Sequence, residues 1–254
     1  MKLECVLTAC NLDPKYFEFI EYFVRAWKTV LDNVDVKVIL ISDHIPESIN
    51  HLQENIILFP PIPNVSDVFI SQYIRLLYPS ILKYLNGVLI TDIDMIPMNS
   101  EYYVNNISHL PGDSFVSYRD ELIEEYSQIP MCYCVANSQT WSELFDVSTI
   151  SDIRNRLVDK YDKNWCRDQM DLYTHVTQFQ LKHPKRVCIL MDRITGFHRL
   201  NRTDHFSLTN EVKRNIRNRK YTDYHVYRPY YKYISINNNI LELLQSSLEN
   251  ESYF

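Results

Sequence analysis

The first half of the chain alternates short apolar runs with segments whose apolar residues recur every three or four positions. The runs are rich in Val and Ile and predict buried strands, whereas the spaced segments predict amphipathic helices. The predicted strands span residues 3–10, 36–42, 56–59 and 88–91. The predicted helices span residues 16–31, 46–53 and 66–85, the last interrupted near Tyr78-Pro79 and ended by Asn86-Gly87. Strands that alternate with helices indicate an α/β fold with a mostly parallel sheet.

Beyond residue 100 the pattern is less regular. Strands are predicted over residues 114–118, 131–136 and 186–191. Helices are predicted over residues 139–145, 150–161 and 166–181, and a terminal helix over residues 240–248. The sequence shows no internal repeat, low-complexity tract or flexible linker, so we expect residues 1–254 to form a single domain.

Composition and charge exclude several classes of function. The hydrophobic content of 46% and charged content of 23% are ordinary for a globular protein. The net charge of −6 argues against general nucleic-acid binding. Residues 182–232 nevertheless carry 13 Lys and Arg against four Asp and Glu. Such a stretch is either a solvated face or a surface that attracts an anion such as a diphosphate.

The sequence also indicates the cellular compartment of the protein and shows which common nucleotide-binding motifs it lacks. The N-terminal stretch lacks the features of a signal peptide, and no run approaches the roughly 18 apolar residues of a membrane span, so we expect a cytoplasmic protein with reduced thiols. The six cysteines lack zinc-site spacing and are interpreted mainly as small buried hydrophobes. With only three glycines, the chain contains neither a dinucleotide-binding glycine fingerprint nor a P-loop.

The strongest candidate for chemistry is a pair of carboxylates, Asp92 and Asp94, that directly follows the apolar strand at residues 88–91. In extended backbone both side chains point to the same side. Ligands bind at the carboxyl ends of parallel strands, and two adjacent carboxylates repel each other unless a cation lies near them. Hard oxygen ligands suit Mg²⁺ or Mn²⁺. The alternative, two strand-end caps that face solvent, fits a wholly apolar strand less well.

The segment of residues 71–97 resembles the metal-dependent glycosyltransferases of the GT-A fold, above all glycosyltransferase family 8 and related virally encoded enzymes. The likeness consists of an arginine-bearing helix, an apolar strand and a D-x-D motif in that order. It implies a GT-A (Rossmann-like), mostly parallel sheet flanked by helices. It also implies that a nucleoside-diphosphate sugar, usually a UDP-sugar, binds through Mn²⁺ or Mg²⁺. Residues 1–98 would then form the nucleotide-sugar half, and residues 99–254 the acceptor and catalytic half.

The same resemblance assigns roles around the motif. Asp94 would ligate the metal directly, and Asp92 would contact both the ribose and the metal, with Ile93 between them in the donor site. Arg75 would lie near the diphosphate or donor sugar; a surface salt bridge is an equally good interpretation. The end of the first strand, Thr8-Ala9-Cys10-Asn11, would hold the base and ribose, although an ordinary strand-to-helix turn explains it too.

Asp168-Gln169 opens a predicted helix and is similar to the Asp-Gln pair near the donor sugar of family 8 enzymes. A carboxylate at a helix N-terminus is stabilised as the anion, which suits a catalytic group beside an oxocarbenium-like centre. Inverting enzymes instead use such a carboxylate as a general base, and a helix-start charge without catalytic duty is a third interpretation. Asp171, one turn later, is a weaker candidate.

The resemblance to the GT-A enzymes also implies a third metal ligand, commonly a His, from the C-terminal part. Gly196-Phe197-His198 fits, since Gly permits close backbone approach and His offers a neutral nitrogen. His205 and His225 are the competing histidines, and Arg199 and Arg202 lie where they would reach phosphates. The chain lacks the H-x-x-G-x-x-K-P-W ending of family 8.

In the enzymes that the chain resembles, a strand–helix corner such as residues 131–141 faces the donor sugar and the acceptor, which implies further candidates for sugar contacts. Asn137 and Ser138 are placed to hydrogen-bond sugar hydroxyls, and Trp141 to stack on a ring. A helix cap and a core residue are the competing interpretation for each.

Together these features predict a metal-dependent glycosyltransferase that moves a sugar from a UDP-sugar to a glycan or protein acceptor with retention of configuration. A bacterial or viral source fits the expected absence of a membrane anchor. Two alternatives stay open. One is a phosphohydrolase of the haloacid-dehalogenase type, which carries its D-x-D after the first strand. The other is a non-catalytic module that binds sugar nucleotides.

Overall fold

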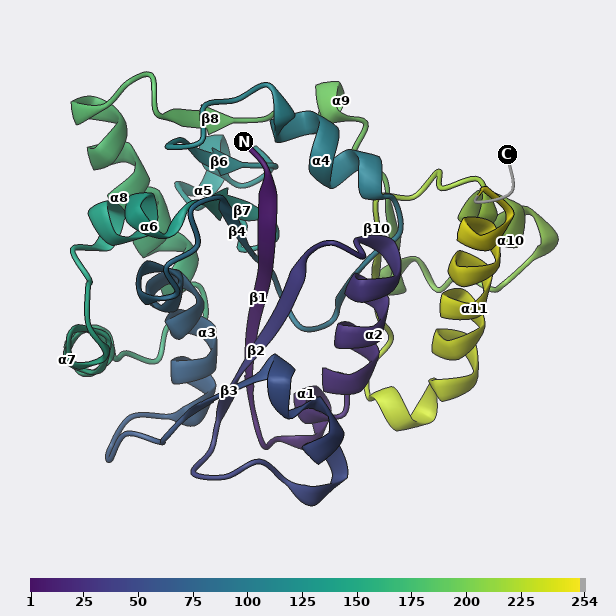
Figure 1. The fold of residues 1–254 in the computed structure, drawn as a ribbon, viewed down its shortest axis with the longest axis horizontal. Coiled ribbons are helices and arrows are strands. Elements are labelled where there is room, and N and C mark those ends of the chain that lie inside the picture. The colour runs from purple at the N-terminus through teal and green to yellow at the C-terminus, as the bar shows by residue number, and fades with distance from the viewer. Residues whose placement is uncertain (252–254) are drawn as a thin grey trace.

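A computed structural model describes residues 1–251 of the chain, and its centre is a seven-stranded sheet with the order β3-β2-β1-β4-β7-β6-β8 (Figure 1). The strands are β1 Leu3–Asn11, β2 Asp35–Ile41, β3 Ile56–Phe59, β4 Gly87–Ile90, β6 Phe115–Ser117, β7 Cys134–Ala136 and β8 Val187–Ile189. Only β7 runs antiparallel to both of its neighbours. The predicted α/β fold with a mostly parallel sheet is therefore confirmed.

Helices cover both faces of this sheet. The helices α3 Asp67–Leu77, α6 Ser138–Phe145, α7 Ile150–Lys160 and α8 Arg167–Lys182 lie on one face. The helices α2 Ile20–Val30, α4 Ser100–Ser108 and α11 Ile234–Glu251 lie on the other (Figure 1). Each face has its own apolar core: Tyr73, Trp141 and Phe145 belong to the first, and Phe23 and Trp27 to the second. Burial of these large side chains is the main stabilising contribution to the layered fold.

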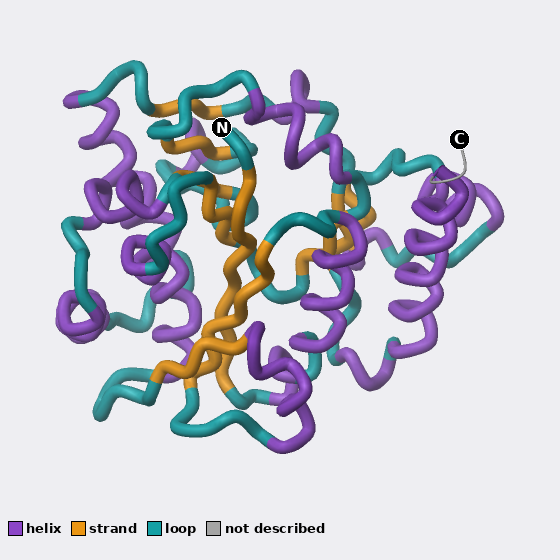
Figure 2. Tube along the Cα trace, in the orientation of Figure 1, coloured by secondary structure: helices purple, strands orange, loops and turns teal. Residues whose placement is uncertain are grey.

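A second, three-stranded sheet adjoins the carboxylate motif and was not predicted. It consists of β5 Met95–Pro97, β10 Asp223–His225 and β9 Arg199–Asn201, with β10 in the centre. Figure 2 shows these short strands apart from the main sheet. Met95 pairs with His225, so the sheet brings a segment more than 100 residues away to the end of the D-x-D motif. Strands of three residues are too short to show an alternating pattern.

The remaining helical elements are short. They are α1 Pro14–Phe17, η1 Glu47–Asn55, η2 Tyr78–Ile81, α5 Ile123–Tyr126, α9 Asp192–Thr195, η3 Arg202–Asp204, α10 Asn210–Arg217 and η4 Tyr230–Lys232. Within residues 1–251, no helix is both long enough and apolar enough to span a bilayer.

Several boundaries differ from the prediction for clear reasons. The helix expected over residues 66–85 ends at Leu77, because Pro79 lacks an amide hydrogen and a 3₁₀ turn replaces the last turns. Gly87 starts β4 and packs closely: a Cβ there would lie 2.7 Å from Cγ2 of Val135. The terminal helix begins at Ile234, earlier than residue 240. All six cysteines are free and four are buried, as expected of small hydrophobes.

Candidate active site at the sheet edge

A cavity of about 250 Å³ lies at the carboxyl ends of β1 and β4. It brings together most of the predicted site residues, namely Ala9, Cys10, Asn11, Arg75, Asp92, Ile93, Asp94, Asp168 and Gln169. They come from β1, α3, the β4–β5 segment and the first turn of α8. The carboxyl edge of a parallel sheet is the general place for ligands in such folds, because the strands end there and the loops diverge.

Arg75 links the two acidic parts of the cavity. Its guanidinium is buried, donates to the Thr91 carbonyl at 3.1 Å and forms an ion pair with Asp92. Its other terminal nitrogen lies 3.3 Å from Oδ2 of Asp168. Burial alone would lower the pKa of Arg75, but the two carboxylates raise it. Arg75 is therefore an internal bridge between α3, the D-x-D motif and α8, and not a surface salt bridge.

Asp94 is buried among three cationic or hydrogen-bonding groups. Nη1 of Arg202 lies 2.7 Å from its Oδ2, Nε of Arg228 lies 3.3 Å away, and Nε2 of His225 lies 3.4 Å away. Burial alone would raise the pKa of Asp94, but His225, Arg228 and Arg202 hold it well below its usual range. The carboxylate is therefore ionised at every physiological pH.

Asp168 has the opposite electrostatic character. The backbone N–H of Gln169 donates to its Oδ1 at 2.9 Å, in the first turn of α8. Burial raises the pKa of Asp168 to about 6. Arg75 opposes this rise only in part, and nearby Asp92 adds to it. Two carboxyl groups in one cavity thus have pKa values shifted in opposite directions, an arrangement typical of functional sites.

The side chain of Gln169 also has an unfulfilled hydrogen-bonding capacity. Its Oε1 is buried and accepts no hydrogen bond from any residue that the structure describes. A buried acceptor without a partner costs about 1–3 kcal/mol. Because Gln169 lines the cavity, a donor group on a ligand would remove this cost.

The structure does not bring His198 to the cavity. Its ring is exposed, its Nδ1 lies 3.2 Å from the Lys220 carbonyl, and it packs against Tyr221 at 4.8 Å between ring centroids. The register of the small sheet explains this position. Arg199 pairs with Asp223 and Asn201 pairs with His225, so His198 lies beyond the far end of the strand pair. His225 lies at the end that adjoins Asp94.

Other predicted residues lie outside the cavity as well. Thr8 is buried and does not line the cavity, and its Oγ1 has no hydrogen-bond partner among the described residues. Asn137 caps α6, accepting from the Thr140 amide at 2.7 Å. Trp141 is fully buried and donates to the Val88 carbonyl at 3.2 Å. The cap and core interpretation holds for these two residues.

The basic stretch of residues 182–232 contributes to the cavity through three side chains, Arg202, His225 and Arg228. Arg228 also donates to the Tyr16 hydroxyl at 2.9 Å, so Tyr16 joins the site from α1. Sequence patterns did not single out Tyr16, Arg228, Met131 or Trp165. The net charge of the stretch was the one sequence signal that pointed to the part of the chain that contains Arg228.

No protein-family model and no curated protein sequence matches the chain. Its structure is similar to that of the glycosyltransferase GlyE from Streptococcus pneumoniae TIGR4, with a TM-score of 0.52 and 14% sequence identity. That match covers 100% of this chain and 64% of GlyE. An active-site mutant of LgtC matches with a TM-score of 0.50 and 14% identity over 95% of both chains. Galactosyltransferase LgtC with donor and acceptor sugar analogues matches with a TM-score of 0.49 and 15% identity, again over 95% of both. The matches to GlyE and to the LgtC mutant show that the chain has the GT-A fold.

Proposed function

We propose that the chain is a metal-dependent glycosyltransferase that transfers a sugar from a UDP-sugar to a glycan or protein acceptor. One observation carries the proposal: the carboxylates of Asp92 and Asp94 share one cavity with Asp168, whose pKa is raised, and with several arginines. A nucleoside diphosphate sugar needs cationic partners for its phosphates and a separate polar group for its sugar, and the cavity offers both.

The proposed metal ligands are the carboxylates of Asp92 and Asp94 and the imidazole of His225, which takes the place first expected for His198. Oxygen and imidazole donors suit Mn²⁺ or Mg²⁺. Within residues 1–251, no three His, Cys, Asp or Glu side chains form a ready-made metal group. The three proposed ligands would therefore have to close around the cation, which would take its remaining ligands from water and substrate phosphates. When bound, it would neutralise the departing nucleoside diphosphate.

Arg202 and Arg228 then acquire a clear role. In the structure described here both pair with Asp94. A divalent cation on Asp94 would compete with them, and a diphosphate would offer new acceptors to the released guanidinium groups. Arginine suits this exchange, because its planar fork binds phosphate oxygens in pairs. The arginines thereby hold the Asp94 carboxylate ionised and would contribute to donor binding.

Asp168 and Gln169 are proposed to act at the donor sugar. The unpartnered Oε1 of Gln169 would accept a hydrogen bond from a sugar hydroxyl, and ionised Asp168 would stabilise positive charge that develops at the anomeric carbon. The segment Ala9–Asn11 and Tyr16, at the other side of the cavity, would hold the nucleoside. Retention of configuration is part of the proposal and rests on the Asp168-Gln169 pair.

The proposal is tested by calorimetric titration of UDP with and without Mn²⁺. Wild-type protein should bind UDP only with Mn²⁺ present, and Asp94→Asn should lose at least about tenfold in affinity, since the ligand and its charge are both removed. Metal-independent binding, or full binding by Asp94→Asn, would contradict it. A phosphohydrolase would instead release inorganic phosphate in a Mg²⁺-dependent reaction that Asp92→Asn abolishes, and a binding module would bind UDP-sugars without turnover.

A further inference from the structure

Trp165 is unusual among the three tryptophans of the chain. Trp27 and Trp141 are fully buried, whereas the side chain of Trp165 is 61% exposed. Tryptophan carries the largest apolar surface of any residue, and leaving it in water forgoes a stabilising burial. Because Trp165 also lines the cavity, it is a candidate contact for a ligand that binds there.

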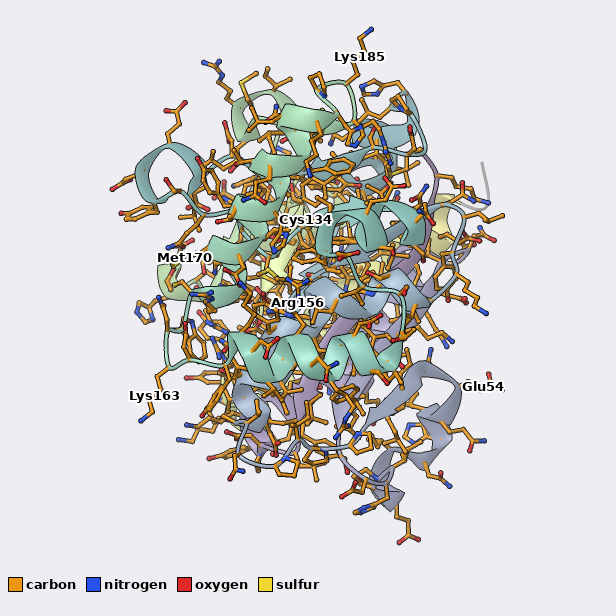
Figure 3. All side chains as sticks on the ribbon, turned by 90° about the vertical axis from the view of Figure 1, so that its left-hand side faces the viewer. Glu54, Cys134, Arg156, Lys163, Met170 and Lys185 are labelled. Atoms are coloured by element: carbon orange, nitrogen blue, oxygen red, sulfur yellow. The ribbon has the colours of Figure 1, made fainter. Side chains whose placement is uncertain are left out.

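The exposure does not come from a loosely held loop. Asn164, the preceding residue, anchors the backbone on both sides of the ring: its amide donates to Oδ1 of Asp162 at 2.7 Å, and its own Oδ1 accepts from the Cys166 amide at 3.0 Å. Arg167 closes the turn through an ion pair with Asp162 at 3.3 Å. Figure 3 views this side of the molecule, where Lys163 points outward from the turn and Met170 lies at the beginning of α8. The backbone that carries the ring is thus fixed just before the start of this helix.

Trp165 lines the same cavity as Asp168 and Gln169, three and four residues further along the chain. Val68 of α3, which is also partly exposed, lines the cavity with it. This part of the cavity belongs to the α3 and α8 face of the sheet. Tyr16 packs against the apolar core of the opposite face, so the cavity has two ends that lie on different sides of the sheet edge.

The chemistry of this end fits a sugar. One face of a pyranose ring presents C–H groups that pack on an indole, and the donor sugar proposed at Gln169 would lie next to this indole in the same cavity. A nucleobase would also stack on tryptophan, but the other end of the cavity already provides an aromatic ring, Tyr16, and an arginine, Arg228, for the nucleotide. We propose that Trp165 is the stacking platform for the acceptor sugar, with Val68 beside it. This proposal rests on the proposed glycosyltransferase function.

The indole itself reports on the proposal, because the other two tryptophans are shielded from solvent. Iodide should quench the emission of wild-type protein strongly and that of Trp165→Phe weakly. With UDP and Mn²⁺ present, lactose, maltose, cellobiose and N,N′-diacetylchitobiose are then titrated one at a time. We expect at least one disaccharide to protect Trp165 from iodide, whereas UDP and Mn²⁺ alone leave the quenching unchanged. Protection by UDP alone, or by none of the disaccharides although UDP binds, would overturn the assignment.

Transfer kinetics with the protecting disaccharide give a second readout. Loss of a stacking contact of about 0.5–1.5 kcal/mol corresponds to an acceptor KM raised about two- to tenfold in Trp165→Ala, with the donor KM unchanged. Trp165→Phe, which keeps a ring, should lie between Trp165→Ala and the wild type. Tyr231→Ala is the matched control, since Tyr231 is 58% exposed and lies outside the cavity. A rise in the donor KM instead would assign Trp165 to the nucleotide. Absence of any UDP binding would refute the glycosyltransferase function itself, which is a distinguishable result.

Discussion

Nε2 of His225 lies 3.4 Å from Oδ2 of Asp94, whereas His198 lies beyond the far end of the same pair of strands. The two histidines form a matched pair for mutation. His225→Ala should weaken Mn²⁺-dependent UDP binding at least about tenfold, because it removes a proposed metal ligand. His198→Ala should leave the affinity within about twofold. Calorimetry with both variants measures the difference. Equal effects, or a larger effect of His198→Ala, would return the third-ligand role to His198.

We expect the side chain of Asp168 to lower the stability of the fold and to support sugar transfer. Its raised pKa means that burial disfavours the ionised form, and Asn imitates the neutral form. Asp168→Asn is therefore expected to unfold at a higher temperature than wild type at pH 8, by a few degrees for a gain of about 1–2 kcal/mol, while it abolishes sugar transfer. Differential scanning calorimetry and a transfer assay test the two halves of this prediction. A lower melting temperature would show that the ion pair with Arg75 outweighs the cost of burial.

The pH dependence of stability follows from the same group. The pKa of Asp168 is about 6 in the folded chain, above its ordinary value of 3.8, so the folded state binds this proton more tightly. Its contribution to stability is complete below about pH 4 and is lost as the pH rises through about 6. The gain in unfolding free energy from Asp168→Asn should therefore grow between pH 4 and pH 7. Urea melts across this range measure it, and a constant difference would argue against the raised pKa.

Catalysis should respond to pH in the opposite direction. If the ionised form of Asp168 stabilises the transition state, kcat falls as the pH drops below about 6. Donor binding at saturating Mn²⁺ should not follow this profile, because the pKa of Asp94 lies far below that range. Saturating Mn²⁺ is needed because the proposed ligand His225 binds a metal only through a neutral imidazole. Parallel measurement of kcat and of UDP affinity between pH 5 and pH 8 separates the two carboxylates. A kcat that stays constant down to pH 5 would remove ionised Asp168 from the chemical step.

Arg75 holds Asp92 and Asp168 together from a fully internal position. Arg75→Met would leave both carboxylates without this partner and should cost about 3–5 kcal/mol of unfolding free energy. The exposed Arg193 provides the control, and Arg193→Met should change stability by less than about 0.5 kcal/mol. Adding Asp168→Asn to Arg75→Met should restore part of the loss, as a double-mutant cycle in urea would show. Strict additivity of the two changes would mean that the contact does not contribute to stability.

The sequence made the main sheet predictable because its strands are long or strongly apolar. The strand at residues 88–91 and the D-x-D that follows it could be placed at the sheet edge from pattern alone. The sequence placed Asp168 at the start of a helix. It could not predict the burial that raises the pKa of Asp168, because this burial depends on the contact between α3 and α8 through Arg75. The choice between His198 and His225 depended on three-residue strands whose register no pattern reveals.

The most direct test of the account is turnover of UDP-glucose and UDP-galactose with Mn²⁺ and an acceptor sugar, followed by proton NMR. The account predicts that UDP forms, that the sugar appears in an α-linked product, and that Asp94→Asn and removal of Mn²⁺ both stop the reaction. Release of inorganic phosphate in place of UDP, or unchanged turnover by Asp94→Asn, would contradict it.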